Sequence, residues 1–189
     1  MTFLSPYFKW VILFAAVTLN NGQDFQNKLF ADHRFTCPPG QVVSEIVGDV
    51  QGMFSKDRRW IVTCKDAPGN AKTTNCQWNR NNYVGCVLST MLYQCPGDKV
   101  ITGMGSDYKD EPTISERQYM FYCCDVEGHV PHSCEYTTFL NKYQGDLNYK
   151  VPKGKVLRGA YSFYLKDGRD RRFKFEFCEM DSYKTTTSG

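Results

Sequence analysis

The sequence has few of the residues on which most enzymes and zinc proteins depend. It contains three histidines in 189 residues, and the motifs Gly-x-Ser-x-Gly, His-Glu-x-x-His and the phosphate-binding loop are absent. No cysteines have Cys-x2-Cys spacing, and the one close histidine–cysteine pair is His132 and Cys134. We therefore expect no catalytic residue, no cofactor and no metal, with paired carboxylates on separate strands as the remaining route to an enzyme.

The chain also lacks a large excess of charge and a second long apolar run. It has 23 Lys and Arg against 20 Asp and Glu, a formal net charge of +3. This balance is not the strongly basic one typical of nucleic-acid-binding proteins, so we expect no nucleic-acid partner. No sustained helical period follows residue 24, and no later segment is apolar enough to enter a bilayer.

The N-terminus has the pattern of a secretory signal peptide. Lys9 precedes an apolar run at 10–19 that is too short to span a bilayer. Ala16 and Thr18 fit the small-residue rule for cleavage, and a cut after Gly22 is the other option; we take residues 1–22 as the signal. A signal anchor is the alternative. The nine cysteines favour export, because an oxidising compartment converts cysteines into disulfides.

One short pattern occurs three times. Each copy has an acid, an arginine, a polar residue and an aromatic residue, followed by a β-type stretch that ends in cysteine. The copies are Asp57-Arg58-Arg59-Trp60, Glu116-Arg117-Gln118-Tyr119 and Asp170-Arg171-Arg172-Phe173. Such self-similarity predicts one supersecondary unit used repeatedly.

The beginnings of the repeats are also similar. Turns at Cys37, Cys95 and Val151, 58 and then 56 residues apart, each precede a valine that opens a predicted strand. The repeats cover about 35–64, 93–124 and 149–178. We predict an all-β domain over 23–189 with three pseudo-symmetric repeats, arranged as a β-prism or trefoil, with a disulfide-linked sandwich as second choice.

Strand periodicity suggests how the cysteines pair. Neighbouring side chains on a strand point to opposite faces, so the adjacent Cys123 and Cys124 need different partners. One class of bridge joins the start of a repeat to its own last strand, and the other joins the approach to a repeat to that strand. The predicted pairs are Cys37–Cys64, Cys95–Cys123, Cys76–Cys124 and Cys134–Cys178. In the third repeat Val151 and Phe177 replace the first class of bridge by an apolar contact.

Cys86 is left without a partner. In a secreted chain an odd cysteine indicates an intermolecular bond or a buried thiol. Its polar surroundings, with Asn81 and Asn82 shortly before it, are consistent with either a disulfide-linked homodimer or a free thiol.

The repeated motif, the vicinal Cys123-Cys124 and the cysteine framework together resemble the dermatopontin family, over about Phe35 to Tyr183. The resemblance implies a secreted extracellular-matrix protein that binds sulfated glycosaminoglycans on proteoglycans, supports cell adhesion and engages collagen or cell-surface receptors. Invertebrate members imply two alternatives, a lectin-like haemagglutinin or cell-aggregation factor of defence, and a shell or skeletal matrix protein. The chain departs from the vertebrate pattern because Tyr119 and Phe173 replace the usual tryptophan and Cys86 is added.

The third repeat is the most basic part of the chain. Between Lys150 and Lys174 there are nine Lys or Arg residues and two Asp residues. Such a surplus attracts polyanions, and arginine suits sulfate oxygens. The predicted glycan-binding residues are Lys150, Lys153, Lys155, Arg172 and Lys174, with a merely solvated surface as the alternative.

The acid-arginine motif itself is better explained by structure than by binding. Its arginine shares a strand face with the aromatic residue of the same copy, so we expect the arginine to stack on that ring and pair with the preceding acid. Three aromatic residues between the repeats, Trp78, Tyr83 and Tyr93, are weaker candidates for stacking on sugar rings.

Overall fold

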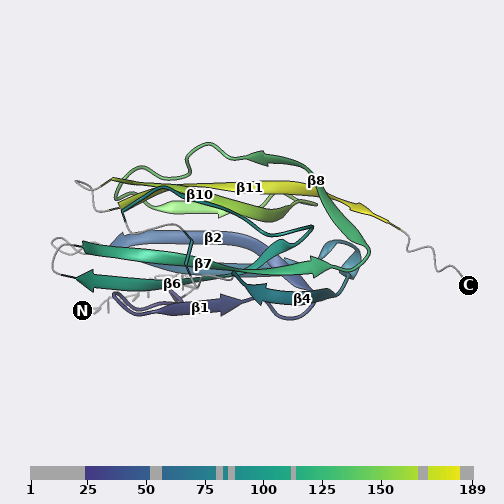
Figure 1. The fold of residues 1–189 in the computed structure, drawn as a ribbon, viewed down its shortest axis with the longest axis horizontal. Coiled ribbons are helices and arrows are strands. Elements are labelled where there is room, and N and C mark those ends of the chain that lie inside the picture. Colours follow the sequence, from purple (N-terminus) through teal and green to yellow (C-terminus); the bar gives the residue numbers. More distant parts are fainter. Residues whose placement is uncertain are drawn as a thin grey trace, which may run out of the picture.

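The computed structural model describes residues 24–51, 57–79, 83–84, 88–111, 114–165 and 170–183. The predicted signal peptide, the three hairpin tips and Cys86 lie outside these residues. Eleven strands and one 3-10 turn make up the described chain (Figure 1). The prediction of an all-β chain is confirmed.

The strands follow one another with short connections. In chain order they are β1 (His33–Thr36), β2 (Gln41–Gln51), β3 (Asp57–Asp66), β4 (Thr73–Trp78), β5 (Met91–Gln94), β6 (Val100–Glu111), β7 (Ile114–Val126), β8 (His129–Tyr136), β9 (Leu147–Lys150), β10 (Val156–Leu165) and β11 (Asp170–Ser182). The 3-10 turn, η1, covers Pro68–Asn70.

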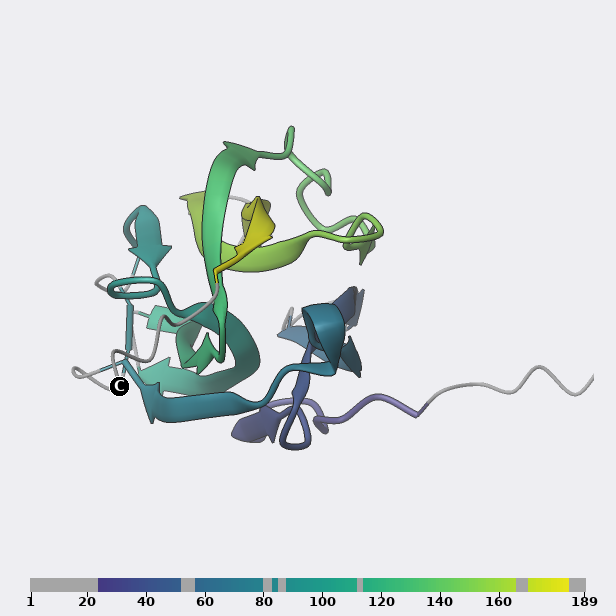
Figure 2. The same cartoon turned by 90° about the vertical axis from the view of Figure 1, so that its right-hand side faces the viewer.

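The strands form three antiparallel sheets, each built on one long hairpin. The first sheet has the order β3-β2-β9, the second β1-β6-β7-β4 and the third β5-β10-β11-β8. Figure 2 shows the hairpins as separate groups: β2–β3 in blue, β6–β7 in teal and β10–β11 in yellow-green. These hairpins are the paired strands that the repeats predicted.

Short strands pass between the sheets in a cyclic order. β1 precedes the first hairpin but pairs with β6 of the second sheet. β5 precedes the second hairpin but pairs with β10 of the third sheet, and β9 precedes the third hairpin but pairs with β2 of the first. Each sheet is therefore completed by a strand from another repeat, so the repeats fold as one interlocked unit.

The three hairpins have the same register around the motif aromatic. Trp60 lies opposite Gly48, Tyr119 opposite Ser106 and Phe173 opposite Ser162. In each hairpin the register also shifts four residues before the residue that faces the aromatic. The shifts lie at Ser44, Thr102 and Arg158. The carbonyl of each shifted residue accepts a hydrogen bond from the N–H that opens another repeat, at Val151, Cys37 and Cys95 respectively. Rotational symmetry and the β-prism or trefoil assignment stay predictions.

The main core forms where the motif aromatics meet. Trp60, Tyr119 and Phe173 are at most 3% exposed. Their rings pack edge to face in all three combinations, with centroids 5.3–5.8 Å apart. This geometry favours aromatic pairs because the positive ring edge meets the negative ring face. The repeat valines Val42 and Val156 are fully buried in a second, smaller cluster that also contains Val100.

The sequence did not predict the short strands that complete the sheets. Trp78 ends β4 and Tyr93 lies in β5, although both were assigned to an irregular stretch. The short strands β1, β4, β5 and β8 show no regular alternation of buried apolar and exposed polar side chains, so they have little periodic signal of their own.

Candidate functional site

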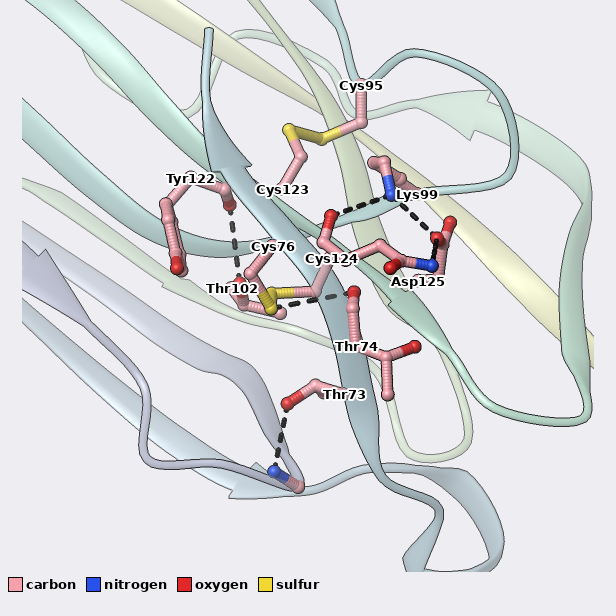
Figure 3. The surroundings of a disulfide bond; sticks show 12 residues. Thr73, Thr74, Cys76, Cys95, Lys99, Thr102, Tyr122, Cys123, Cys124 and Asp125 are labelled. Carbon is pink, nitrogen blue, oxygen red and sulfur yellow. Dashed lines mark hydrogen bonds and ion pairs between the residues drawn. A yellow bond between two sulfur atoms is a disulfide. The ribbon is translucent and has the colours of Figure 1, made fainter.

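The predicted cysteine pairs are the disulfides of the structure. Sulfur–sulfur bonds join Cys37–Cys64, Cys76–Cys124, Cys95–Cys123 and Cys134–Cys178. Figure 3 shows the adjacent Cys123 and Cys124 directed to different partners, as strand alternation requires. Where the third repeat has no such bridge, Val151 is buried and Phe177 packs against the main core.

The acid-arginine motif forms a closed set of buried ion pairs between the repeats. Arg117 donates to Asp57 at 2.6 Å. Arg58 donates to Asp170 at 2.8 Å, and Arg171 contacts Glu116. The arginine that follows the acid in each copy therefore pairs with the acid of another repeat.

The same carboxylates also hold the chain that leads into each hairpin. Asp57 accepts the N–H of Phe30, Glu116 that of Leu88, and Asp170 that of Gln144. These three donors have positive φ angles of 62°, 59° and 58°. Each arginine also donates to the carbonyl that follows, at Ala31, Ser89 or Gly145. The acids and arginines of the motif therefore have a structural role. Their charges are paired inside the protein and join the three hairpins.

The expectation that each arginine pairs with its own preceding acid was wrong. Stacking on the motif aromatic holds for Arg58, which lies 5.7 Å from the Trp60 ring. Arg117 instead lies over Tyr108 and Arg171 over Tyr164, which are their cross-strand neighbours. An acid and the residue after it point to opposite faces of a strand, so the acid of another hairpin is better placed.

The outward face of the third sheet combines cations with exposed rings. Arg172 lies opposite Phe163, and Lys174 lies opposite Tyr161. The alternate residues of β11, including Phe173, face the core. We call this surface the cation–aromatic face. Its members are Leu92, Tyr136, Phe139, Tyr143, Tyr161, Phe163, Arg172 and Lys174.

Two of the predicted glycan-binding cations meet over one ring of this face. The Arg172 guanidinium lies 4.2 Å and the Lys174 amine 4.6 Å from the centroid of Phe139. Arg172 Nε also donates to the carbonyl of Asn141 at 3.1 Å. Neither cation forms an ion pair with a carboxylate among the described residues. Their positive charge is therefore available to an anion.

A shallow hollow lies beside Lys174. Its volume is about 170 Å³, and Leu92, Tyr136, Tyr161 and Lys174 line it. Burial, followed by the charge of the nearby Glu176 carboxylate, raises the pKa of Tyr136. The hollow offers apolar surface, two tyrosine hydroxyls and one ammonium group.

The other three predicted cations lie elsewhere. Lys150 ends β9 in the first sheet, opposite Glu45. Lys153 is exposed in the turn before β10. Lys155 pairs with Glu135 at 3.2 Å and Glu179 at 3.5 Å, and these carboxylates raise its pKa. The structure brings Arg172 and Lys174 together over Phe139. Lys150 belongs to another sheet, and the charge of Lys155 is already shared between two carboxylates.

The three aromatic candidates have different surroundings. Tyr83 donates to Asp107, and Lys109 lies 5.4 Å over its ring. Arg34 also donates to Asp107, and although burial alone would raise the pKa of this carboxyl, the two hydrogen bonds lower it. Trp78 and Tyr93, in contrast, line a separate cleft.

Sequence reasoning missed the aromatic part of the cation–aromatic face. Phe139 lies in a segment without strand periodicity, and Leu92 comes from an edge strand that was not predicted. The alternation of β10 could have revealed part of this face from the sequence. It puts Tyr161 and Phe163 on one side of the strand and Ala160 and Ser162 on the other. Among the described residues no group of three His, Cys, Asp or Glu is placed to hold a metal ion. No described helix is long and apolar enough to cross a membrane.

Comparison with known proteins gives one consistent result. The model of the family described as Dermatopontin matches residues 26–182. Dermatopontin of Biomphalaria glabrata is 33% identical over 145 residues, covering 77% of this chain and 93% of the relative. Human dermatopontin is 30% identical over 159 residues, covering 79% of this chain and 73% of the relative. The hemagglutinin/amebocyte aggregation factor of Limulus polyphemus is 27% identical over 174 residues, covering 90% and 94%. No solved structure matches.

Proposed function

This chain belongs to the dermatopontin family, and from that premise we propose that it is a secreted matrix and cell-adhesion protein that binds sulfated glycosaminoglycan through the cation–aromatic face. Membership supports the adhesive role, and four disulfides fit an oxidising compartment. Proteoglycans that carry such glycans are the expected partners.

One observation carries the proposal, namely the convergence of Arg172 and Lys174 on the ring of Phe139. Stacking restrains both side chains, so less conformational freedom is lost when an anion binds. Arginine offers a planar pair of donors for sulfate oxygens, while lysine supplies a compact charge. The rings of Tyr161 and Phe163 beside them provide apolar surface for the carbon face of a sugar.

The other cations of the chain are poorer candidates. Arg58, Arg117 and Arg171 are buried in ion pairs. Lys155 is shared between two carboxylates. We therefore narrow the binding site from the five predicted cations to Arg172 and Lys174, with Lys150 and Lys153 contributing only long-range attraction.

Heparin-affinity chromatography tests the proposal. The variant Arg172→Gln/Lys174→Gln should elute at clearly lower salt than the wild type, because it loses the two restrained cations. Retention of the wild type should fall steeply with added salt, since exposed charges are screened.

The matched control is Lys150→Gln/Lys153→Gln, which removes the same charge from another part of the surface. Equal losses in the two double variants would mean that retention reports net charge alone, and the proposed site would be rejected. Unchanged thermal unfolding of both variants is required for the comparison.

The Limulus relative favours a second candidate, a lectin-like aggregation factor. An agglutinating protein must bind glycans on two cells at once. A second sugar site on the same chain would therefore support this function. Release of bound protein by a free neutral monosaccharide, rather than by salt, would favour this function.

A further inference from the structure

A cleft separate from the cation–aromatic face lies between β4 and β5. Its volume is about 470 Å³, and it is lined by Gln77, Trp78, Asn79, Tyr93, Gln94 and Pro96. The first three belong to β4 and the residue after it, and the last three to β5 and the segment that follows. The two walls come from strands of different sheets.

The vicinal cysteines tie both walls to one point of the fold. Cys76, immediately before Gln77, is bonded to Cys124, and Cys95, between Gln94 and Pro96, is bonded to Cys123 (Figure 3). Because the two anchors are neighbours on β7, the walls are covalently fixed relative to each other. Among the described residues, the corresponding strands β3 and β11 each carry one bridge, at Cys64 and Cys178. A fixed cleft loses little conformational entropy when a ligand binds.

The rings of the cleft are held by packing. Trp78 contacts Tyr122 with ring centroids 5.1 Å apart. Tyr93 stacks on Phe121 at 5.2 Å with an interplanar angle of 13°, and burial raises its pKa. Restrained rings of this kind offer an apolar platform at low entropic cost.

The polar groups of the cleft are amides with known orientations. Asn79 Oδ1 accepts the N–H of Phe121 at 2.9 Å, which leaves the Nδ2 side as donor. Gln94 Nε2 donates to both oxygens of Glu176, at 3.0 and 2.9 Å, which leaves Oε1 as acceptor. None of the six described lining residues carries a formal charge at neutral pH.

We propose that this cleft is a binding site for an uncharged hexose unit of a glycan, with the sugar ring on Trp78 and its hydroxyl groups on the amides of Asn79 and Gln94. A hydroxyl is both donor and acceptor, so it matches an amide donor and an amide acceptor in one cleft. A sulfated unit finds no cation among the lining residues that the structure describes. The cleft and the cation–aromatic face are therefore two glycan sites of different chemistry on one chain. The cleft binds uncharged sugars and the face binds sulfated ones.

Saturation-transfer NMR and calorimetry on the full chain test this assignment. The probes are methyl glycosides of glucose, galactose, mannose and N-acetylglucosamine, each at low and high sodium chloride. At least one should bind with an affinity that salt does not change, since no charge is involved. Trp78→Ala should weaken that binding about tenfold or more, and Trp78→Phe, which keeps a ring, should weaken it less.

Tyr183→Ala is the control, because it removes an exposed ring that belongs to neither proposed site and should leave hexose binding unchanged. Absence of binding by all four glycosides would overturn the proposal, as would binding that is equal in the wild type and Trp78→Ala. Arg172→Gln/Lys174→Gln should retain hexose binding while losing heparin, so failure of either site is distinguishable from failure of the other.

Discussion

The guanidinium of Arg58 lies 2.8 Å from the carboxylate of Asp170, although 112 residues separate them. Together with Arg117–Asp57 and Arg171–Glu116, this contact closes a ring of ion pairs through all three repeats. A repeated motif that looks local in sequence thus acts between repeats. Its function is to hold the three hairpins together.

The Arg58–Asp170 pair should contribute strongly to stability. Arg58→Met leaves the Asp170 carboxylate, 8% exposed, without its cation. Loss of one partner of a buried pair costs about 3–5 kcal/mol of unfolding free energy. Urea unfolding of Arg58→Met measures this cost. Arg59→Gln, which removes the partly exposed pair with Asp49, is the control and should cost about 1 kcal/mol or less. Equal costs would contradict the structural role of the motif.

The size of the motif aromatic is matched to the residue opposite it. A Cβ atom added to Gly48 would lie 2.8 Å from the Trp60 ring. Tyr119 and Phe173, with smaller rings, face serines at the same register. Gly48→Ser should therefore destabilise the protein by about 1–3 kcal/mol through overpacking. In Gly48→Ser/Trp60→Tyr, part of that loss should be recovered, as a double-mutant cycle on thermal unfolding would reveal; strict additivity would refute the size match.

Acid should weaken the fold through His33. Burial, followed by the charges of Arg117 and Arg34, lowers the pKa of His33 from 6.5 to about 4. The folded state keeps this imidazole neutral, whereas the unfolded state binds a proton below 6.5. The contribution of His33 to the free energy of unfolding is therefore fully present above pH 6.5. It is lost as the pH falls from 6.5 towards 4, by about 3 kcal/mol in all. Denaturant unfolding of His33→Asn across this range should give a shallower decline than the wild type, and parallel curves would exclude His33 as the cause.

Cys86 should mediate covalent association. Eight of the nine cysteines are joined within the chain, so Cys86, which lies outside the described residues, has no intrachain partner left. Electrophoresis without reductant should therefore show a dimer band that disappears in Cys86→Ser. A monomer band alone in the oxidised wild type would mean that this thiol is free.

The sequence predicted those elements whose residues repeat. The three hairpins, the four cysteine pairs and the burial of Val42 and Val156 all correspond to patterns visible along the chain. The flanking strands and Phe139 have no such pattern, because a short edge strand is defined by the partner that pairs with it. The sequence therefore predicted the two cations of the cation–aromatic face, Arg172 and Lys174. It did not predict the aromatic residues around them.

By itself, the sequence determined that this protein is a disulfide-linked all-β chain that contains one motif three times, because turns, strand periodicity and cysteine alternation are local properties. Only the tertiary structure decided which acid each arginine meets, which cations stay unpaired, and which rings surround them. These outcomes depend on strands passing from one sheet to the next. Contacts between residues far apart in sequence are set by packing of the whole core, and no local pattern encodes them.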